Sequence, residues 1–483
     1  MRKGSLTVFF SLILTILCTL FFSMSEAIRI VGMSNRSKVV TREALTSVCS
    51  EYQPYLWDTY QILAVDGAYG KEQWEETMVE NRMDDFLWNN CNSGKGFFQV
   101  EPVGTEIEKY SLLTDGEGAI FMHQAANMAI KQMSMEAIQN WSEMVKNLNG
   151  DEETATDVDA AVDAAQEALE HPEKMEGTGE AMEEPELEEL PPATYDNPFD
   201  IYGQIKEKGW LGLVTDGENI SEKSMSTDQV VSKRTLRKGT ETISQDAIDL
   251  PMYEWYLLKQ FGHYGNQKEG PGLAYQVEYI IAGKSSDKEN LEYIVGALLG
   301  VREVANMVTI TSSPQMIQQA AQLSVSLAGA SANPALIKLV QAGVIAVWAL
   351  VESILDVRTL LNGGKVAIKK TQEQWTSQLY ALAAYLSPSQ KAKESEKGIS
   401  YAYYLASKLL LLNRKALGLR PLDLMEEDLR QQEKYTNCRM DHMICSMEAF
   451  CSYSSQPIFT SVIGEGIASK SLYDYQCHQS ISY

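Results

Sequence analysis

The apolar segment near the amino terminus constrains the fold of this chain more than any other feature. Residues Ser5 to Ser25 form a run of 21 positions without a charged side chain. At about 1.5 Å of rise per helical residue, such a run crosses the roughly 30 Å hydrocarbon core of a bilayer. We therefore expect a transmembrane signal anchor over residues 5–27, in contact with the lipid bilayer through residues 5–25.

The charges around this segment predict its orientation. Arg2 and Lys3 precede it, and the positive-inside tendency places residues 1–4 in the cytoplasm. The most apolar later segment, Leu339 to Val351, has only 13 residues, which suits a buried helix better than a second span. We expect a single-pass protein of the cell membrane, with the rest of the chain extracytoplasmic.

A cleaved secretory signal is the alternative interpretation of the same segment. The residues Ser25-Glu26-Ala27 resemble a small-x-small cleavage site, which would make Ile28 the first residue of a secreted protein. The uncharged stretch is longer than the usual core of a signal peptide, and the helical pattern continues beyond Ala27 without a turn signal. Both features favour a retained anchor.

Charge is distributed unevenly along the chain. The formal net charge of −24 argues against nucleic acid as a partner, because phosphate binding needs clustered Lys and Arg. Residues 151–200 contain eighteen acidic residues and one basic residue, with several Pro and Gly among them. We expect residues 148–198 to be a disordered acidic linker.

The hydrophobic pattern predicts an α+β fold in which helices flank a small, mostly antiparallel sheet. Ala335 to Leu361 is apolar on most faces, which is typical of the central helix of a bundle. Strands are predicted at 97–103, 106–113, 273–282, 457–462 and 471–483, the last two joined by Gly464-Glu465-Gly466. The predicted segments after the anchor are 28–147 (helical stalk and first part of the extracytoplasmic domain), 148–198 (linker), 199–430 (mainly helical, with one strand near 273–282) and 431–483 (helix and β-hairpin).

No motif in the sequence indicates a reaction. Gly283-Lys284-Ser285 follows a predicted strand, but a phosphate loop needs glycine where Glu278 stands, so no nucleotide is expected. The sequence contains neither HExxH nor GxSxG. We expect no catalytic residue, no cofactor and no enzymatic activity.

Cysteine and histidine gather near the carboxyl terminus. Cys438, His442 and Cys445 have the spacing i, i+4, i+7, which would place them on one face of a helix predicted at 424–450. With Cys477 they are weak candidates for a zinc site. A disulfide is the alternative, and its candidates are Cys438, Cys445, Cys451 and Cys477. Unpaired, buried thiols are the third possibility.

One basic cluster suggests a surface contact. Lys233, Arg234, Arg237 and Lys238 are expected to be exposed, either as an ordinary charged loop or in contact with the acidic segment, lipid or wall polymers.

The amino terminus resembles a known family. Lys3-Gly4-Ser5-Leu6-Thr7-Val8 followed by an apolar helix is similar to the start of TadE- and TadG-like minor pseudopilins of tight-adherence (Tad) systems. The resemblance implies a processing site between Gly4 and Ser5. These pseudopilins carry a glutamate five positions after the glycine, where this chain has Phe9. Phe9 cannot supply the carboxylate that pairs with a neighbour's amine in the membrane.

A second resemblance covers most of the remaining chain. Val277-Glu278-Tyr279-Ile280-Ile281-Ala282-Gly283-Lys284 is similar to an uncharacterised domain-of-unknown-function family of Gram-positive anaerobes. Further matching positions are Asp287-Lys288-Glu289-Asn290-Leu291, Arg302-Glu303, Trp348-Ala349 to Glu352, Asp356-Val357-Arg358, Gly363-Gly364-Lys365-Val366 and Arg439-Met440-Asp441. The resemblance implies single-pass envelope proteins, often encoded beside Tad pilus genes.

Together these features predict a non-enzymatic, membrane-anchored envelope protein. It would be an accessory or minor-pseudopilin-like component of a Tad-type assembly, with other envelope or pilus-assembly proteins as partners. Strands near 97–103, 273–282 and 457–483 would supply docking edges. An anchored envelope enzyme or a solute-binding protein is the alternative class, and a secreted protein cleaved after Ala27 is a third.

Overall fold

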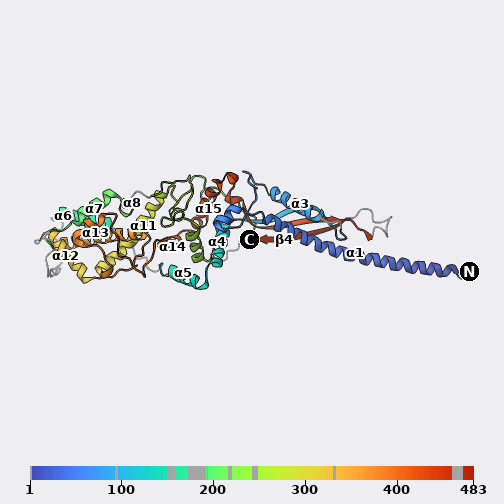
Figure 1. Ribbon diagram of the computed structural model, residues 1–483, viewed down its shortest axis with the longest axis horizontal. Coiled ribbons are helices and arrows are strands. Elements are labelled where there is room, and N and C mark those ends of the chain that lie inside the picture. The colour runs from blue at the N-terminus through green and yellow to red at the C-terminus, as the bar shows by residue number, and fades with distance from the viewer. Residues whose placement is uncertain are drawn as a thin grey trace. The chain divides into compact units, whose positions relative to one another are not determined.

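Two compact units make up the computed structural model (Figure 1), which describes residues 3–92, 96–148, 158–171, 192, 194–215, 220–241, 248–329, 333–459 and 472–483. The first unit combines Met1–Met128, Val230–Asp249 and Leu422–Tyr483, and the second combines Ala129–Gln229 and Leu250–Pro421. Each unit is assembled from separate stretches of the chain. The unit boundaries therefore cut across the predicted segments 28–147 and 199–430, whereas the predicted segment 431–483 lies within the first unit.

A four-stranded antiparallel sheet forms the base of the first unit. Its strands are β1 (Val65–Asp66), β2 (Glu101–Leu112), β3 (Met443–Ser455) and β4 (Tyr473–Ser482). β3 is central and pairs with each of the other three. The predicted strands 97–103 and 106–113 are one bulged strand, β2, and the predicted strand 471–483 is confirmed as β4.

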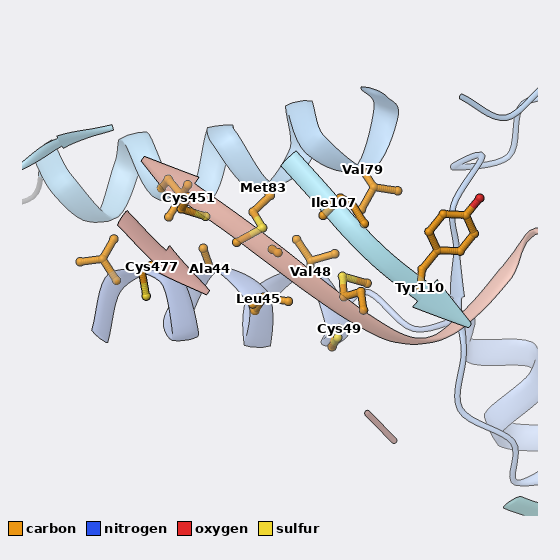
Figure 2. Close-up of a cluster of buried hydrophobic side chains, with 14 of the residues drawn as sticks. Ala44, Leu45, Val48, Cys49, Val79, Met83, Ile107, Tyr110, Cys451 and Cys477 are labelled. Carbon is orange, nitrogen blue, oxygen red and sulfur yellow. The ribbon is translucent and has the colours of Figure 1, made fainter. Parts of the chain in front are cut away.

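Helices cover one face of this sheet. They are α1 (Lys3–Cys49) and α3 (Glu76–Asn92), and a short helix, α2 (Pro54–Tyr60), follows α1. Figure 2 shows Ala44 and Val48 of α1 and Met83 of α3 gathered against sheet residues such as Ile107 and Cys451. Alternate residues of β3 are buried in this core, while Glu448 on the opposite face is partly exposed. This pattern is typical of an antiparallel sheet covered on one side.

The second unit is helical. It contains α5 (Met135–Leu148), α6 (Val158–Glu170), α7 (Pro198–Lys208), α8 (Trp210–Val214), α9 (Leu250–Gln260), α10 (Gln276–Ala282), α11 (Asp287–Thr311), α12 (Pro314–Ala328), α13 (Pro334–Leu361) and α14 (Tyr401–Leu410). Two more helices, α4 (Asp115–Gln132) and α15 (Arg414–Arg430), contain the positions where the chain changes unit.

The predicted central helix at 335–361 is confirmed as α13. Every residue from Gly343 to Leu361 is buried, and α6, α7, α8, α11 and α12 all pack on it. The helix begins where the Asn333 side chain accepts a hydrogen bond from the Ala335 amide, with proline at the first helical position. A helix that is apolar on all faces is stable only when it is enclosed in this way.

The strand predicted at 273–282 is wrong, because residues Gln276–Ala282 form helix α10. All residues from Gln276 to Ile281 are buried, so the run shows neither the alternation of a strand nor the polar face of a surface helix. Periodicity alone does not separate the two structures in so short an apolar run. One predicted docking edge is therefore absent, and Gly283 follows a helix instead of a strand.

The helix predicted at 424–450 is wrong beyond Arg430, where α15 ends. Residues Met443–Ser455 form β3, the central strand of the sheet. Residues 457–459 are not in a strand, so this part of the prediction at 457–462 is also wrong. The rest of that segment and the predicted turn at Gly464 lie outside the described residues.

Part of the predicted acidic linker is an ordered helix. In α6, the side chains of Val162 and Ala165 are 0% exposed. Ala165 packs against Gly343 of α13 so closely that a Cβ atom added to Gly343 would lie 2.6 Å from the Ala165 Cβ. The prediction of disorder is wrong for these residues. The acidic positions between 149 and 191 that precede or follow α6 lie outside the described residues.

Candidate functional site

The first half of α1 exposes apolar side chains on every side. None of its most apolar window is buried, and Phe9, Leu14 and Leu20 are each more than half exposed. A helix of this length and composition is stable in the hydrocarbon core of a bilayer. α1 is therefore long and apolar enough to span a membrane, which supports anchoring by this helix.

Two other helices, α11 and α13, are also long and apolar enough to span a membrane. The apolar run at 339–351, which is expected to form a buried helix, belongs to the longer helix α13. Half or more of the apolar window of each is buried inside the second unit. Packing within the protein accounts for their apolar composition, and the first half of α1 has no such packing.

The second half of α1 packs on the sheet through a buried stripe at helical spacing. The stripe contains the apolar residues Met33, Val40, Ala44 and Val48, all at 0% exposure. The same face of the helix begins directly after the apolar run with a charged residue, Glu26, that is also buried. The helix thus passes from an exposed apolar half to a sheet-packed half without a break.

Arg29 of α1 forms hydrogen bonds with residues at one end of the sheet. Its guanidinium lies 3.1 Å from the Glu26 carboxylate, and both side chains are almost fully buried. It also donates hydrogen bonds to the Phe97 carbonyl, the Gln456 carbonyl and the Ser455 hydroxyl at 3.1, 2.8 and 2.9 Å. One side chain therefore joins the helix to the two loops at this end of the sheet.

Residues with aromatic side chains contact this ion pair through their main chain. The Glu26 carboxylate accepts a hydrogen bond of 2.8 Å from the Phe459 amide. The ring of Phe459 stacks on Phe22 at 5.8 Å and lies 5.9 Å from Phe97. The junction combines a satisfied charge pair inside with aromatic side chains near it. We take the apolar half of α1 together with this junction as the candidate functional site.

The predicted processing sites all lie in α1. Gly4 and Ser5 lie in its first turn. Ala27 and Ile28 are exposed in the middle of the continuous helix, between the buried Glu26 and Arg29. Cleavage after Ala27 would separate this ion pair into two chains, whereas an uncleaved α1 keeps it. Processing at either place stays a prediction.

The predicted zinc ligands do not share a helical face. Cys438 precedes a 3-10 turn that contains His442, and Cys445 lies in β3. Within the part of the chain that the structure describes, the group with ligand atoms close enough for a metal is Glu108, Glu448 and His478, on the partly exposed face of the sheet. There Glu448 already pairs with Lys109 at 2.7 Å. The helical arrangement that motivated the zinc prediction is wrong.

The seven cysteines are free thiols in the structure. Burial raises the pKa of the Cys438 thiol to about 12 and that of Cys451 to about 11. The β3–β4 register sets Cys451 opposite Cys477, and both point into the same core. Directly opposed residues of antiparallel strands have Cα separations that a disulfide can bridge. Among the cysteines predicted to form a disulfide, Cys451 and Cys477 are therefore a pair whose positions allow one.

The basic cluster at 233–238 is largely structural. The Arg234 side chain is only 9% exposed, and it pairs with Glu426 at 2.5 Å and Asp441 at 2.6 Å. The guanidinium of Arg237 lies 4.0 Å from the centre of the Trp74 ring and donates to the Trp74 carbonyl. The expectation that the whole cluster is exposed is wrong for Arg234, because carboxylates distant in sequence enclose it.

Buried charges also organise the second unit. Arg302 pairs with Asp356 at 2.9 Å, and Lys370 pairs with Asp356 at 2.5 Å and with Glu352. Arg358 is satisfied by main-chain oxygens, including those of Leu213 and Tyr385. Several residues that carry the second family resemblance are therefore parts of an interior scaffold.

Glu254 is a fully buried acidic residue of this unit. It is 0% exposed, and neither carboxylate oxygen has a hydrogen-bond partner among the described residues. Burial raises the pKa of Glu254 from 4.5 to about 9, so the folded chain holds it protonated at neutral pH. The sequence offered no signal for this, since the residue stands in an ordinary apolar helix.

We predict that Glu254 makes stability fall as pH rises. Between pH 4.5 and about 9 the unfolded chain has lost this proton while the folded chain keeps it. The free energy of unfolding therefore decreases by about 1.4 kcal/mol per pH unit across this window. Glu254→Gln should match the parent chain near pH 4.5 and exceed it at pH 8, in urea unfolding followed at both pH values. Glu292→Gln, at an exposed position of α11, is the control. Parallel pH profiles for the parent and Glu254→Gln would contradict the prediction.

The fold and the site define a protein with an amino-terminal helix able to span a membrane and a packed α+β body. Within that class, the chain belongs to DUF5702, a family of unknown function, whose pattern matches residues 188–455. The match covers most of the second unit and extends through β3, and it leaves α1 outside. No curated protein and no solved structure matches the chain.

Proposed function

We propose that this protein is a single-pass envelope protein whose amino terminus is cytoplasmic and whose two units are extracytoplasmic. The observation that carries the proposal is the division of α1 into a fully exposed apolar half and a half buried against an antiparallel sheet. Arg2 and Lys3 before the helix favour this orientation.

We further propose that it acts by protein–protein contact, as an accessory or minor-pseudopilin-like component of a Tad-type assembly. Support comes from the amino-terminal Lys3-Gly4-Ser5 pattern and from a helix that continues unbroken from an apolar half onto a sheet. Phe9 stands where a pseudopilin carboxylate would pair, so the proposal favours an accessory at the membrane over a filament subunit. Detection of the chain in isolated surface filaments, after membranes have been removed, would reverse that preference.

Two charges in the apolar half should abolish anchoring. Leu14 and Leu17 are both more than half exposed in the structure. Replacing each leucine near the centre of a span with arginine costs about 3–4 kcal/mol of insertion free energy. We expect the Leu14→Arg, Leu17→Arg chain to be released from membranes by alkaline carbonate, while the parent chain stays in the pellet.

The matched control carries the same added charge outside the span. Asn35→Arg, Val39→Arg places two arginines at exposed positions of the sheet-packed half of α1. This chain should remain in the pellet. If the Leu14→Arg, Leu17→Arg chain also resists carbonate, α1 is not the anchor. If the parent chain purified from native cells is soluble and begins at Ile28, it is a secreted protein.

A further inference from the structure

The exposed surface of α1 carries no charged side chain for about ten residues beyond Ser25, where the uncharged run of the sequence ends. Glu26 and Arg29 end that run, but both point into the protein. The exposed side chains that follow are apolar, with Ile28 and Val31 at 60% and 62% exposure. From Leu6 to Asn35, the described surface of the helix therefore presents no charged group to its surroundings.

This length matches a whole bilayer rather than its hydrocarbon core. Thirty helical residues span about 45 Å, and a bilayer including both headgroup regions is roughly 40–45 Å thick. If Ser5 lies at the cytoplasmic edge of the hydrocarbon, Ser25 lies at its outer edge. The outer headgroup region is about 5–7.5 Å deep, so residues 26 to 30 cross it and residues 31–35 extend just beyond it.

Two loops of the first unit reach this level of the helix. Phe459 stacks on Phe22, about one turn on the membrane side of Ser25. Phe98 packs on Gly32, where an added Cβ would come within 2.2 Å of its ring atoms. The loops at 96–99 and 456–459, which we call the collar, therefore lie beside the part of α1 that crosses the interface.

The side chains of the collar suit that environment. Phe97, Phe98 and Ile458 are 43%, 41% and 46% exposed. Aromatic residues are enriched at the headgroup level, where an amphipathic setting favours their rings. Large apolar side chains exposed to water on one end of a domain otherwise mark an interaction surface.

Main-chain polar groups of the collar form hydrogen bonds with buried side chains of the protein, which suits an environment with little water. Arg29 binds the carbonyls of Phe97 and Gln456, and Glu26 accepts from the Phe459 amide. Backbone groups near hydrocarbon need such internal partners, because water is scarce there. The charges that provide them neutralise each other inside the protein.

We propose that the collar inserts into the outer interface of the bilayer, so that the first unit rests on the membrane surface. The proposal depends on the anchoring proposed above and adds a second lipid contact to it. Its occupant is lipid rather than a second copy of the chain, because the collar continues the exposed apolar surface of the anchor helix at the depth of the headgroups.

Spin labels on the full chain in phosphatidylcholine–phosphatidylglycerol vesicles test this proposal. Native Cys18 is exposed in the anchor, and the other six cysteines are buried, so a label reports the chosen position. The collar is read by Phe98→Cys and, separately, Ile458→Cys, each with Cys18→Ser. Val103→Cys with Cys18→Ser is the aqueous control, at a 67% exposed position of β2. Cys18→Ser alone gives the background.

The expected result is that collar labels collide several-fold less often than the Val103→Cys label with a water-soluble nickel complex, while colliding readily with oxygen. If the collar labels match Val103→Cys while Cys18 reads as membrane-embedded, the collar proposal fails and the anchor stands. If the collar labels are shielded from both agents, protein covers the collar and lipid insertion is wrong. If Cys18 itself reads as aqueous, the anchor and the collar both fail.

Discussion

Arg29→Met should destabilise the first unit by about 3–5 kcal/mol, the cost of removing one partner of a buried ion pair. The variant leaves Glu26 buried without its cation. It also removes the hydrogen bonds that hold the main chain at Phe97 and Gln456. Methionine keeps the length and most of the apolar part of the arginine side chain. The loss of stability therefore measures the contribution of the guanidinium charge and its hydrogen bonds. Hydrogen exchange of β3 and β4 amides in the purified full chain would measure the change.

Arg42→Met is the control, because Arg42 lies on the same helix at an exposed position. We expect its effect to stay within about 0.5 kcal/mol, as for most surface substitutions. A second variant, Glu26→Gln with Arg29→Met, should recover part of the loss, since it removes the uncompensated charge. Equal effects of Arg29→Met and Arg42→Met would mean that the ion pair does not hold the collar loops.

The extent of α1 could be predicted from the sequence only in part. The apolar run marks its first half, and apolar residues at helical spacing mark the end of its second half. Between them the buried face carries Glu26, Arg29 and Ser37, which no hydrophobic pattern identifies as core. The Arg29 side chain finds two of its partners more than four hundred positions away, at Ser455 and Gln456. The candidate site depends on these contacts, which sequence spacing does not reveal.

Helix and strand were confused where burial is complete or the pattern is ambiguous. The run Gln276 to Ile281 is buried on all sides in α10, which removes the periodic signal. The helix predicted at 424–450 includes most of β3, and the helical spacing of Cys438, His442 and Cys445 agrees with that wrong prediction. The true signal of β3 is the alternation of Met447, Ala449 and other inward residues. α13 was predicted correctly because its length alone excludes a strand.

Lys370→Met should destabilise the second unit by a similar amount, about 3–5 kcal/mol. Lys370 is 1% exposed at its side chain and lies between two buried carboxylates, Glu352 and Asp356. Asp356 keeps Arg302 at 2.9 Å in the variant, and Glu352 keeps the amide of Ser377 at 2.8 Å. Two negative groups then share one cation in the interior. We expect faster hydrogen exchange along α13, measured by mass spectrometry of its peptides.

Lys369→Met provides the matched control one residue away. Lys369 is exposed, so the same change of side chain there should leave the exchange of α13 within about 0.5 kcal/mol of the parent. The double variant Lys370→Met, Glu352→Gln should be more stable than Lys370→Met alone, because it restores one positive group to one negative group around Asp356. If Lys370→Met and Lys369→Met have the same small effect, the buried charges do not stabilise α13. Packing of its apolar faces alone would then hold the central helix in place.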